Sequence, residues 1–133
     1  MIVVDTNVIA YLYLDSPETS VAERVLLADP EWRAPVLWRS EFRNVLVHYL
    51  RRGILSSEKG FQIAEKAELR MQGREYLVSS AQVLRLAASS KCSAYDCEFV
   101  ALAQELGVKL VTADKRVVSE FPETAIALDA FGL

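Results

Sequence analysis

The stretch Ile2-Val-Val-Asp5-Thr-Asn-Val-Ile9, next to the amino terminus, decides the fold class. Its residues 2–4 are apolar and β-branched, which is typical of a short strand buried on both faces. Asp5 ends this apolar run, and the polar pair Thr6-Asn7 that follows can cap a helix. The stretch therefore predicts a buried strand that ends at Asp5 and leads directly into a helix.

The rest of the sequence alternates between helical and strand patterns. Apolar periodicity and capping residues predict further helices over about 16–28, 38–53, 56–71, 81–88, 93–106 and 114–122, with Ser16 as the cap of the first of these and Pro17 at its first turn. Short apolar segments at about 30–35, 76–78, 109–112 and 125–128 fit strands between them. Strands separated by helices form right-handed crossovers, so we expect an α/β three-layer sandwich with a mostly parallel central sheet.

Composition narrows the class of protein. A chain of 133 residues fits one domain spanning residues 1–133, and its net charge of -3 means that a nucleic acid would need local attraction. The two cysteines, Cys92 and Cys97, fall on different helix faces and fit small core residues. The longest apolar run, Val8 to Leu14, is too short to span a bilayer. No secretory signal is evident, so we expect a cytoplasmic protein without membrane contact.

Carboxylates occupy unusual places in this pattern. In parallel sheets the functional crevice lies outside the carboxyl ends of the strands, which is where Asp5 and Asp114 fall. On helical wheels, Glu41 borders a buried stripe and Asp96 shares the face of apolar residues that follow it. Clustered carboxylates that lose hydration either raise their pKa values or bind cations. An oxygen-only set with no His or Cys nearby suits Mg²⁺ or Mn²⁺.

Each of these acids also has an ordinary structural role open to it. Asp5 can cap the first helix, and Asp114 can start a turn or cap another. Glu41 and Asp96 can complement helix dipoles, because both occupy first turns. The joint placement, two acids after strands and two on inward helical faces, is what favours a common site over separate roles.

The same residues resemble the PIN-domain family, and within it the VapC-type toxins of bacterial and archaeal toxin-antitoxin pairs. The resemblance spans nearly the whole chain and rests on four segments. These are residues 2–9, Ser40-Glu41-Phe42, Tyr95-Asp96 with Ala101 and Ala103, and Leu110-Val-Thr112-Ala-Asp114. It implies about five parallel strands, a cleft at their carboxyl edge, and one or two Mg²⁺ or Mn²⁺ ions that promote hydrolysis of RNA phosphodiester bonds. It also implies an antitoxin partner.

The resemblance assigns roles to individual residues. Asp5 and Asp96 correspond to direct metal ligands, and Glu41 and Asp114 complete the shell or act through water. These carboxylates are oriented by three neighbouring residues, Thr6, Asn7 and Thr112. The family often has a further acid or Asn after the fourth carboxylate, whereas this chain has Lys115-Arg116, which puts a second metal in doubt and offers possible phosphate contacts. His48, the sole histidine, lies about two turns from Glu41 and is not expected to be catalytic.

Other readings compete with a metal-dependent endoribonuclease. An aspartyl phosphatase would need a second Asp two residues after Asp5, where this chain has Asn7. A receiver domain would need an acidic pair closing the first strand. The remaining alternative to the endoribonuclease is a non-catalytic PIN-like scaffold that binds protein or RNA. Apolar residues of the second to fourth helices fit core packing, homodimerisation or antitoxin capture. These include Val21, Leu26, Phe61 and Ile63.

Overall fold

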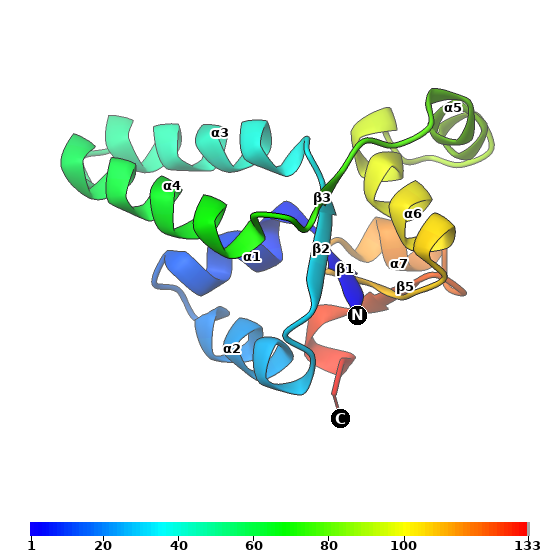
Figure 1. Ribbon diagram of the computed structural model, residues 1–133, viewed down its shortest axis with the longest axis horizontal. Coiled ribbons are helices and arrows are strands. Elements are labelled where there is room, and N and C mark those ends of the chain that lie inside the picture. The colour runs from blue at the N-terminus through cyan, green and yellow to red at the C-terminus, as the bar shows by residue number, and fades with distance from the viewer. Residues whose placement is uncertain (133) are drawn as a thin grey trace.

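The computed structural model describes residues 1–132 and forms a parallel sheet flanked by helices (Figure 1). The strands are β1 (Ile2–Val4), β2 (Trp32–Pro35), β3 (Glu75–Tyr76), β4 (Leu110–Thr112) and β5 (Ala125–Ala127). The helices are α1 (Thr6–Tyr13), α2 (Thr19–Ala28), α3 (Trp38–Arg51), α4 (Ser57–Met71), α5 (Ser80–Ala88), α6 (Ala94–Leu106) and α7 (Lys115–Glu120), followed by the short 3-10 helix η1 (Leu128–Ala130).

The sheet has five strands in the order β3-β2-β1-β4-β5, and every neighbouring pair is parallel. The chain winds from β1 outward to β3 and then crosses to β4 and β5 on the other side. Because right-handed crossovers in opposite directions cover opposite faces, α1 to α4 lie on one face and α5 to α7 on the other (Figure 1). This confirms the expected three-layer α/β sandwich. The winding reverses between β1 and β4, which is where ligands bind in open parallel sheets.

The burial of the core explains how strands this short can form a stable sheet. Val3 and Val4 of the central strand are fully buried, so β1 contributes apolar surface to both helical layers. Trp32 and Trp38 are the largest of the fully buried side chains. Trp38 also packs on Phe42 one turn later, with ring centroids 5.6 Å apart. Both side chains belong to the buried core, which anchors the start of α3 there.

The second helix begins later than the sequence predicts. It starts at Thr19 rather than at Ser16 or Pro17. The Thr19 hydroxyl donates to the carbonyl oxygens of Tyr11 and Leu14 at 2.7 and 3.2 Å, which holds the preceding residues in a turn against α1. Pro17 therefore lies in the connection, before the helix.

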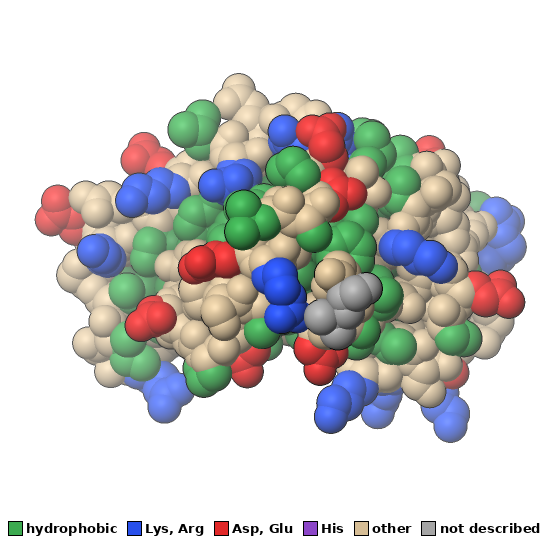
Figure 2. Space-filling view, turned by 90° about the horizontal axis from the view of Figure 1, so that it is seen from below, with side chains coloured by type: hydrophobic (Ala, Val, Ile, Leu, Met, Phe, Trp, Pro, Cys, Tyr) green, Lys and Arg blue, Asp and Glu red, His purple; other side chains and the backbone are tan. Residues whose placement is uncertain are grey.

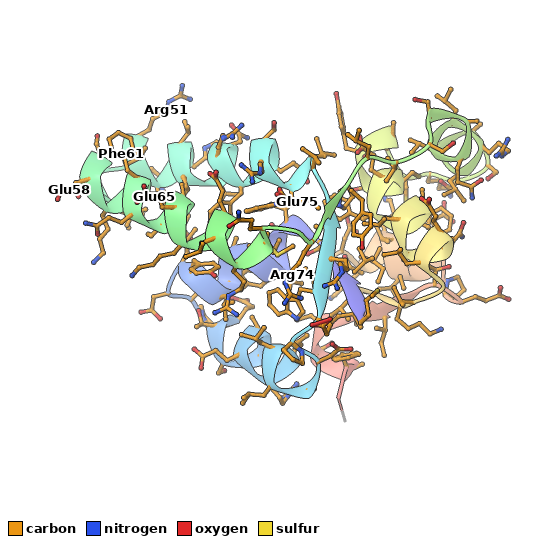
Figure 3. All side chains as sticks on the ribbon, in the orientation of Figure 1. Arg51, Glu58, Phe61, Glu65, Arg74 and Glu75 are labelled. Atoms are coloured by element: carbon orange, nitrogen blue, oxygen red, sulfur yellow. The ribbon has the colours of Figure 1, made fainter. Side chains whose placement is uncertain are left out.

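Most of the apolar residues noted in the second to fourth helices belong to the core or pack against it. Val21 and Leu26 pack against the core cluster, and Ile63 belongs to it. Phe61 is the exception, with 69% of its surface exposed, and lies on the outer part of the α3–α4 arm (Figure 3). Both cysteines are buried and unpaired, as expected. Within residues 1–132, no helix combines the length and apolar character needed to cross a membrane.

Charges are mixed over the surface that Figure 2 presents. Lys and Arg side chains alternate there with Asp and Glu, and apolar groups lie between them (Figure 2). This face carries no field of a single sign, in keeping with the small net charge of -3. Any attraction of a polyanion to this face must come from local groups.

Candidate active site

The structure brings Asp5, Glu41, Asp96 and Asp114 to one cavity of about 250 Å³, the acidic cavity. Asp5 follows β1 and Asp114 follows β4, so both lie at the carboxyl edge of the sheet where the winding reverses. Glu41 and Asp96 reach the cavity from the first turns of α3 and α6. Four acids that are distant in the sequence thus meet in one place.

Asp5 is held by hydrogen bonds from two directions. Its Oδ1 accepts the backbone N–H of Val8 at 3.0 Å, so Asp5 itself caps α1, and the prediction of Thr6 or Asn7 as the cap is wrong. Its Oδ2 accepts the Thr112 hydroxyl and the N–H of Ala113 at 3.1 Å. Burial raises the pKa of the Asp5 carboxyl, although these hydrogen bonds oppose the shift.

Glu41 is held by one neighbour from the first strand-helix junction. The Thr6 hydroxyl donates to Glu41 Oε1 at 2.7 Å. Desolvation raises the pKa of the Glu41 carboxyl, the Thr6 hydrogen bond lowers it, and repulsion from Asp96 and Asp5 raises it further. Without a bound cation, the carboxyl groups of Glu41 and Asp5 therefore both lose their protons less readily than exposed ones do.

The start of α3, and with it Glu41, is fixed by an ion-pair network on the side away from the acidic cavity. Arg39 Nε lies 2.6 Å from Glu75 Oε2, and Arg39 Nη1 lies 2.8 Å from Glu68 Oε1. The buried indole N–H of Trp38 also donates to Glu75, at 2.7 Å. Figure 3 shows Glu75 where α3, α4 and β3 approach one another. Arg39 is engaged in this network and is not a free cation for a phosphate.

Asp96 and Asp114 combine a capping role with their place in the acidic cavity. The N–H of Asp96 donates to Ser93 Oγ at 3.1 Å and the N–H of Ser93 to Asp96 Oδ2 at 3.4 Å, which confirms the predicted capping box. Asp114 caps α7 by accepting the N–H of Arg116 at 2.8 Å. Asp96 and Asp114 therefore each cap a helix and also line the acidic cavity.

The predicted neighbours and basic residues divide into two groups. Thr6, Asn7 and Thr112 line the acidic cavity with the four carboxylates. Lys115 and Arg116 are exposed and do not line it, but Lys115 lines a cavity that adjoins it. His48 is exposed and lies outside the cavity, which agrees with the expectation for it.

Two polar residues near the site were not predicted. Asn44 lines the acidic cavity one helical turn after Glu41, and its i+3 spacing could have identified it. Glu98 on α6 is half-buried, burial raises the pKa of its carboxyl, and its charge contributes to the raised pKa of Glu41. Glu98 also lines a separate cavity beside β3 and α5. The Glu98 position gave no sequence signal, because its face of α6 depends on how that helix packs.

The donor set of the acidic cavity suits a hard divalent cation, although the side chains would have to turn to bind one. Across residues 1–132, no three carboxylate, imidazole or thiol groups are already placed to hold one ion. The carboxylates of Asp5, Glu41, Asp96 and Asp114 instead accept hydrogen bonds from the protein. All available ligand atoms are oxygens, as Mg²⁺ and Mn²⁺ prefer. A cation would also offset the desolvation that raises the pKa values of Asp5 and Glu41.

Comparison with known proteins agrees with this architecture. Ribonuclease VapC3 from Pyrobaculum aerophilum is 31% identical over 125 residues, which cover 91% of this chain and 95% of that protein. The crystal structure of PAE2754 from the same organism matches with a TM-score of 0.76 and 19% identity, over 96% of this chain and 90% of that one. The crystal structure of FitAcB from Neisseria gonorrhoeae matches with a TM-score of 0.78 and 16% identity, over 98% of this chain and 100% of that one.

The family itself follows from the sequence match. At these low identities the two solved structures bear on the fold alone. The family model described as PIN domain matches residues 2–125, which include all four acids of the acidic cavity. The chain therefore belongs to the PIN-domain family.

Proposed function

We propose that this protein is a metal-dependent endoribonuclease that hydrolyses RNA phosphodiester bonds and acts as the toxin of a toxin-antitoxin pair. The observation that carries the proposal is the meeting of Asp5, Glu41, Asp96 and Asp114 in one cavity at the carboxyl edge of the sheet. A relative of 31% identity is named a ribonuclease, which supports the reaction class. The resemblance to VapC-type toxins supports the biological role.

The chain's own residues supply the ligands and their orientation. Asp5 and Asp96 are the direct ligands, and Glu41 and Asp114 complete the shell. Thr6 and Thr112 donate hydrogen bonds to Glu41 and Asp5, and Asn7 lines the same cavity, so these three orient the carboxylates. A bound Mg²⁺ or Mn²⁺ would supply positive charge beside the scissile phosphate and lower the pKa of water there.

Basic residues outside the acidic cavity are the proposed phosphate contacts. Lys115 and Arg116 are exposed at the start of α7, directly after Asp114. Their position in the chain places two cations beside the acids without entering the ligand set. We assign them to RNA phosphates that flank the cleaved one.

Exposed apolar side chains support the proposed protein partners, a homodimer and an antitoxin. Leu77 and Leu84 are 88% and 64% exposed, and both line a cavity of about 470 Å³ near the edge strand β3. Phe61 and Leu69 on α4 are 69% and 72% exposed. Exposed apolar groups that gather in one place, as Leu77 and Leu84 do around the cavity near β3, are typical of contact surfaces. We also propose that this activity takes place in the cytoplasm, where RNA is available as a substrate.

Calorimetry separates this proposal from a non-catalytic scaffold. Titration of Mn²⁺ into the wild type should give binding heat, and Asp96→Asn should abolish it while the Asn side chain still accepts the Ser93 N–H. Glu105→Gln, an exposed acid on the same helix outside the acidic cavity, is the matched control and should bind like the wild type. Equal heats for the wild type and Asp96→Asn would favour the scaffold.

Cleavage of a mixed pool of RNA and single-stranded DNA tests the reaction directly. RNA should be cut with Mn²⁺ present, and cutting should stop with a chelator or in Asp5→Asn. Cutting that survives both changes would come from a contaminating nuclease. Cutting of DNA alone would overturn the substrate class.

A further inference from the structure

A second cavity adjoins the acidic cavity. Its volume is about 310 Å³, and it shares Thr112 and Asp114 with the acidic cavity. Its walls come from α1, the residue before α2, the β4–α7 connection and the start of η1. The volume is at the lower end of the range of about 300–1,000 Å³ for small-molecule sites. We call it the side cavity.

Helix α1 connects the two cavities. Asn7 lines the acidic cavity and Tyr11 lines the side cavity, and residues four apart share one face of a helix, about 6 Å apart along its axis. The Tyr11 ring is half-buried, and its hydroxyl makes no hydrogen bond to any residue in the described part of the chain. Burial, with the nearby charges of Glu18 and Asp5, raises the pKa of this phenol. An aromatic wall thus lies one turn from the acidic cavity.

The charged groups of the side cavity are one lysine and two carboxylates besides Asp114. Lys115, Glu18 and Asp129 line it and are all exposed. Over residues 1–132, neither Glu18 nor Asp129 has an ion-pair partner within the chain. The remaining wall is largely apolar. Its members are Ala113, Val118, Ala127 and Leu128. The cavity therefore combines an aromatic face, a cation and unpaired acceptors.

We propose that the side cavity binds the nucleoside next to the scissile phosphate of the RNA, with its base against Tyr11, and that it prefers guanine. This inference rests on the proposed function, because an RNA held in the acidic cavity must place a flanking nucleotide beside it. Aromatic rings bind unstacked RNA bases in this way. Lys115 contacts a phosphate of the same nucleotide.

The preference for guanine follows from the chemistry of the two carboxylates. Ionised Glu18 and Asp129 only accept hydrogen bonds. Guanine presents two neighbouring donors, N1–H and the 2-amino group, to one carboxylate, whereas uracil presents one N–H between two carbonyl oxygens that the carboxylates repel. Adenine and cytosine present a single amino group. We therefore expect affinity to be highest for guanine and lowest for uracil.

Binding of mononucleotides tests the subsite without any metal or cleavage. The four nucleoside 5′-monophosphates are titrated into the full chain in the presence of a chelator, and amide NMR shifts of Ala113, Lys115 and Ala127 are followed. Guanosine monophosphate should bind about ten-fold more tightly than uridine monophosphate, the discrimination given by a good bidentate pair. Tyr11→Leu should weaken binding about ten-fold through lost stacking. Equal affinities for all four nucleotides, or shifts confined to other residues, would overturn the proposal.

Cleavage-site mapping gives the second test. Wild-type protein with Mn²⁺ should cut a randomised RNA preferentially beside guanine, and the double variant Glu18→Gln with Asp129→Asn should lose this preference. Both changes are at exposed positions and should leave the fold intact, which guards against failure of Tyr11→Leu to fold. Glu23→Gln, an exposed acid on α2 that lines neither cavity, is the matched control and should cut like the wild type.

The outcomes separate the two proposals. RNA cleavage whose base preference is unchanged in the double variant would overturn the guanine subsite and leave the nuclease standing. Selective binding of guanosine monophosphate without any RNA cleavage would support the subsite and overturn the proposed nuclease.

Discussion

The hydroxyl of Thr6 donates a hydrogen bond of 2.7 Å to Oε1 of Glu41, and so joins the start of α1 to the first turn of α3. This bond lowers the pKa of the Glu41 carboxyl against the effect of burial. It is the direct link in the acidic cavity between the amino-terminal stretch and α3. Removing this hydrogen bond therefore tests what sets the pKa of the Glu41 carboxyl.

Thr6→Val keeps the shape of the side chain and removes the donor. The pKa of Glu41 should rise further, because the hydrogen bond that lowered it is gone. The acidic limb of the pH–rate profile for RNA cleavage should move to higher pH, and cleavage should fall about 10–100-fold, as for other residues that orient metal ligands. Thr6→Ser restores the hydroxyl and should restore the profile. An unshifted limb in Thr6→Val would contradict this account of Glu41.

The charge of Glu41 should destabilise the ion-free fold at neutral pH. Its pKa in the folded state is raised by burial, so the stability that this group contributes is complete below about pH 4 and is lost as the pH rises through the folded value. Glu41→Gln removes the charge, and its amide oxygen can still accept from Thr6. In chelator at pH 7, urea unfolding should show the variant to be more stable than the wild type, and the difference should vanish near pH 3.5. A constant difference across this range would exclude ionisation as its cause.

Metal binding should stabilise the folded wild type. A ligand that binds only the folded state at 100 times its dissociation constant adds about 2.7 kcal/mol to the free energy of unfolding. Mn²⁺ at that excess should stabilise the wild type by this amount and leave Asp96→Asn unchanged, as measured by urea unfolding. Sodium chloride at the same ionic strength controls for general salt effects. Equal stabilisation of both proteins by Mn²⁺ would locate the ion elsewhere.

Glu75 should matter for stability although it lies outside the acidic cavity. It accepts hydrogen bonds from the buried Trp38 indole and from Arg39. Glu75→Leu leaves the indole N–H without its partner, which costs about 1–3 kcal/mol, and adds a smaller loss from the partly exposed Arg39 pair. Glu75→Gln keeps an acceptor and should lose less. Urea unfolding of both variants measures the two losses, and equal losses would contradict the hydrogen-bond explanation.

The cysteines should resist alkylation in the folded protein. Both are buried, and burial with nearby carboxylates raises the pKa of the Cys92 thiol from 9.0 to about 11. A rise of this size lowers the thiolate fraction at pH 8 about 100-fold. Iodoacetamide labelling followed by mass spectrometry should therefore be slow in buffer and rapid at both residues in urea. Rapid labelling in buffer would show local opening of the α5–α6 connection at Cys92 or of α6 at Cys97.

Local patterns in the sequence were enough to predict the sheet and most helices. The apolar run before Asp5 predicts β1, and Ser93 with Asp96 predicts the start of α6, because a strand pattern and a capping box need only neighbouring residues. The four acids could be selected for the same reason, since their places after strands or beside apolar stripes are local properties. Their convergence in space could only be hypothesised.

Features that depend on distant contacts could not be predicted. The late start of α2 results from bonds between Thr19 and the carbonyl oxygens of α1 and its end. The partner of Arg39, Glu75, lies 36 residues further along the chain, so the ion pair has no local sequence pattern. The side cavity is lined by both Tyr11 and Asp129, and no local pattern connects residues so far apart.

The hydrogen bond from Thr112 to Asp5 spans 107 positions of the chain, and this separation has a consequence for protein synthesis. A ribosome releases the amino-terminal strand long before the segment that contains Thr112 and Asp114, so a nascent or truncated chain carries Asp5 without the hydroxyl that holds it and lacks the fourth acid of the acidic cavity. The proposed ribonuclease activity would thus be absent beside the messenger and ribosome until translation of the last strands is complete.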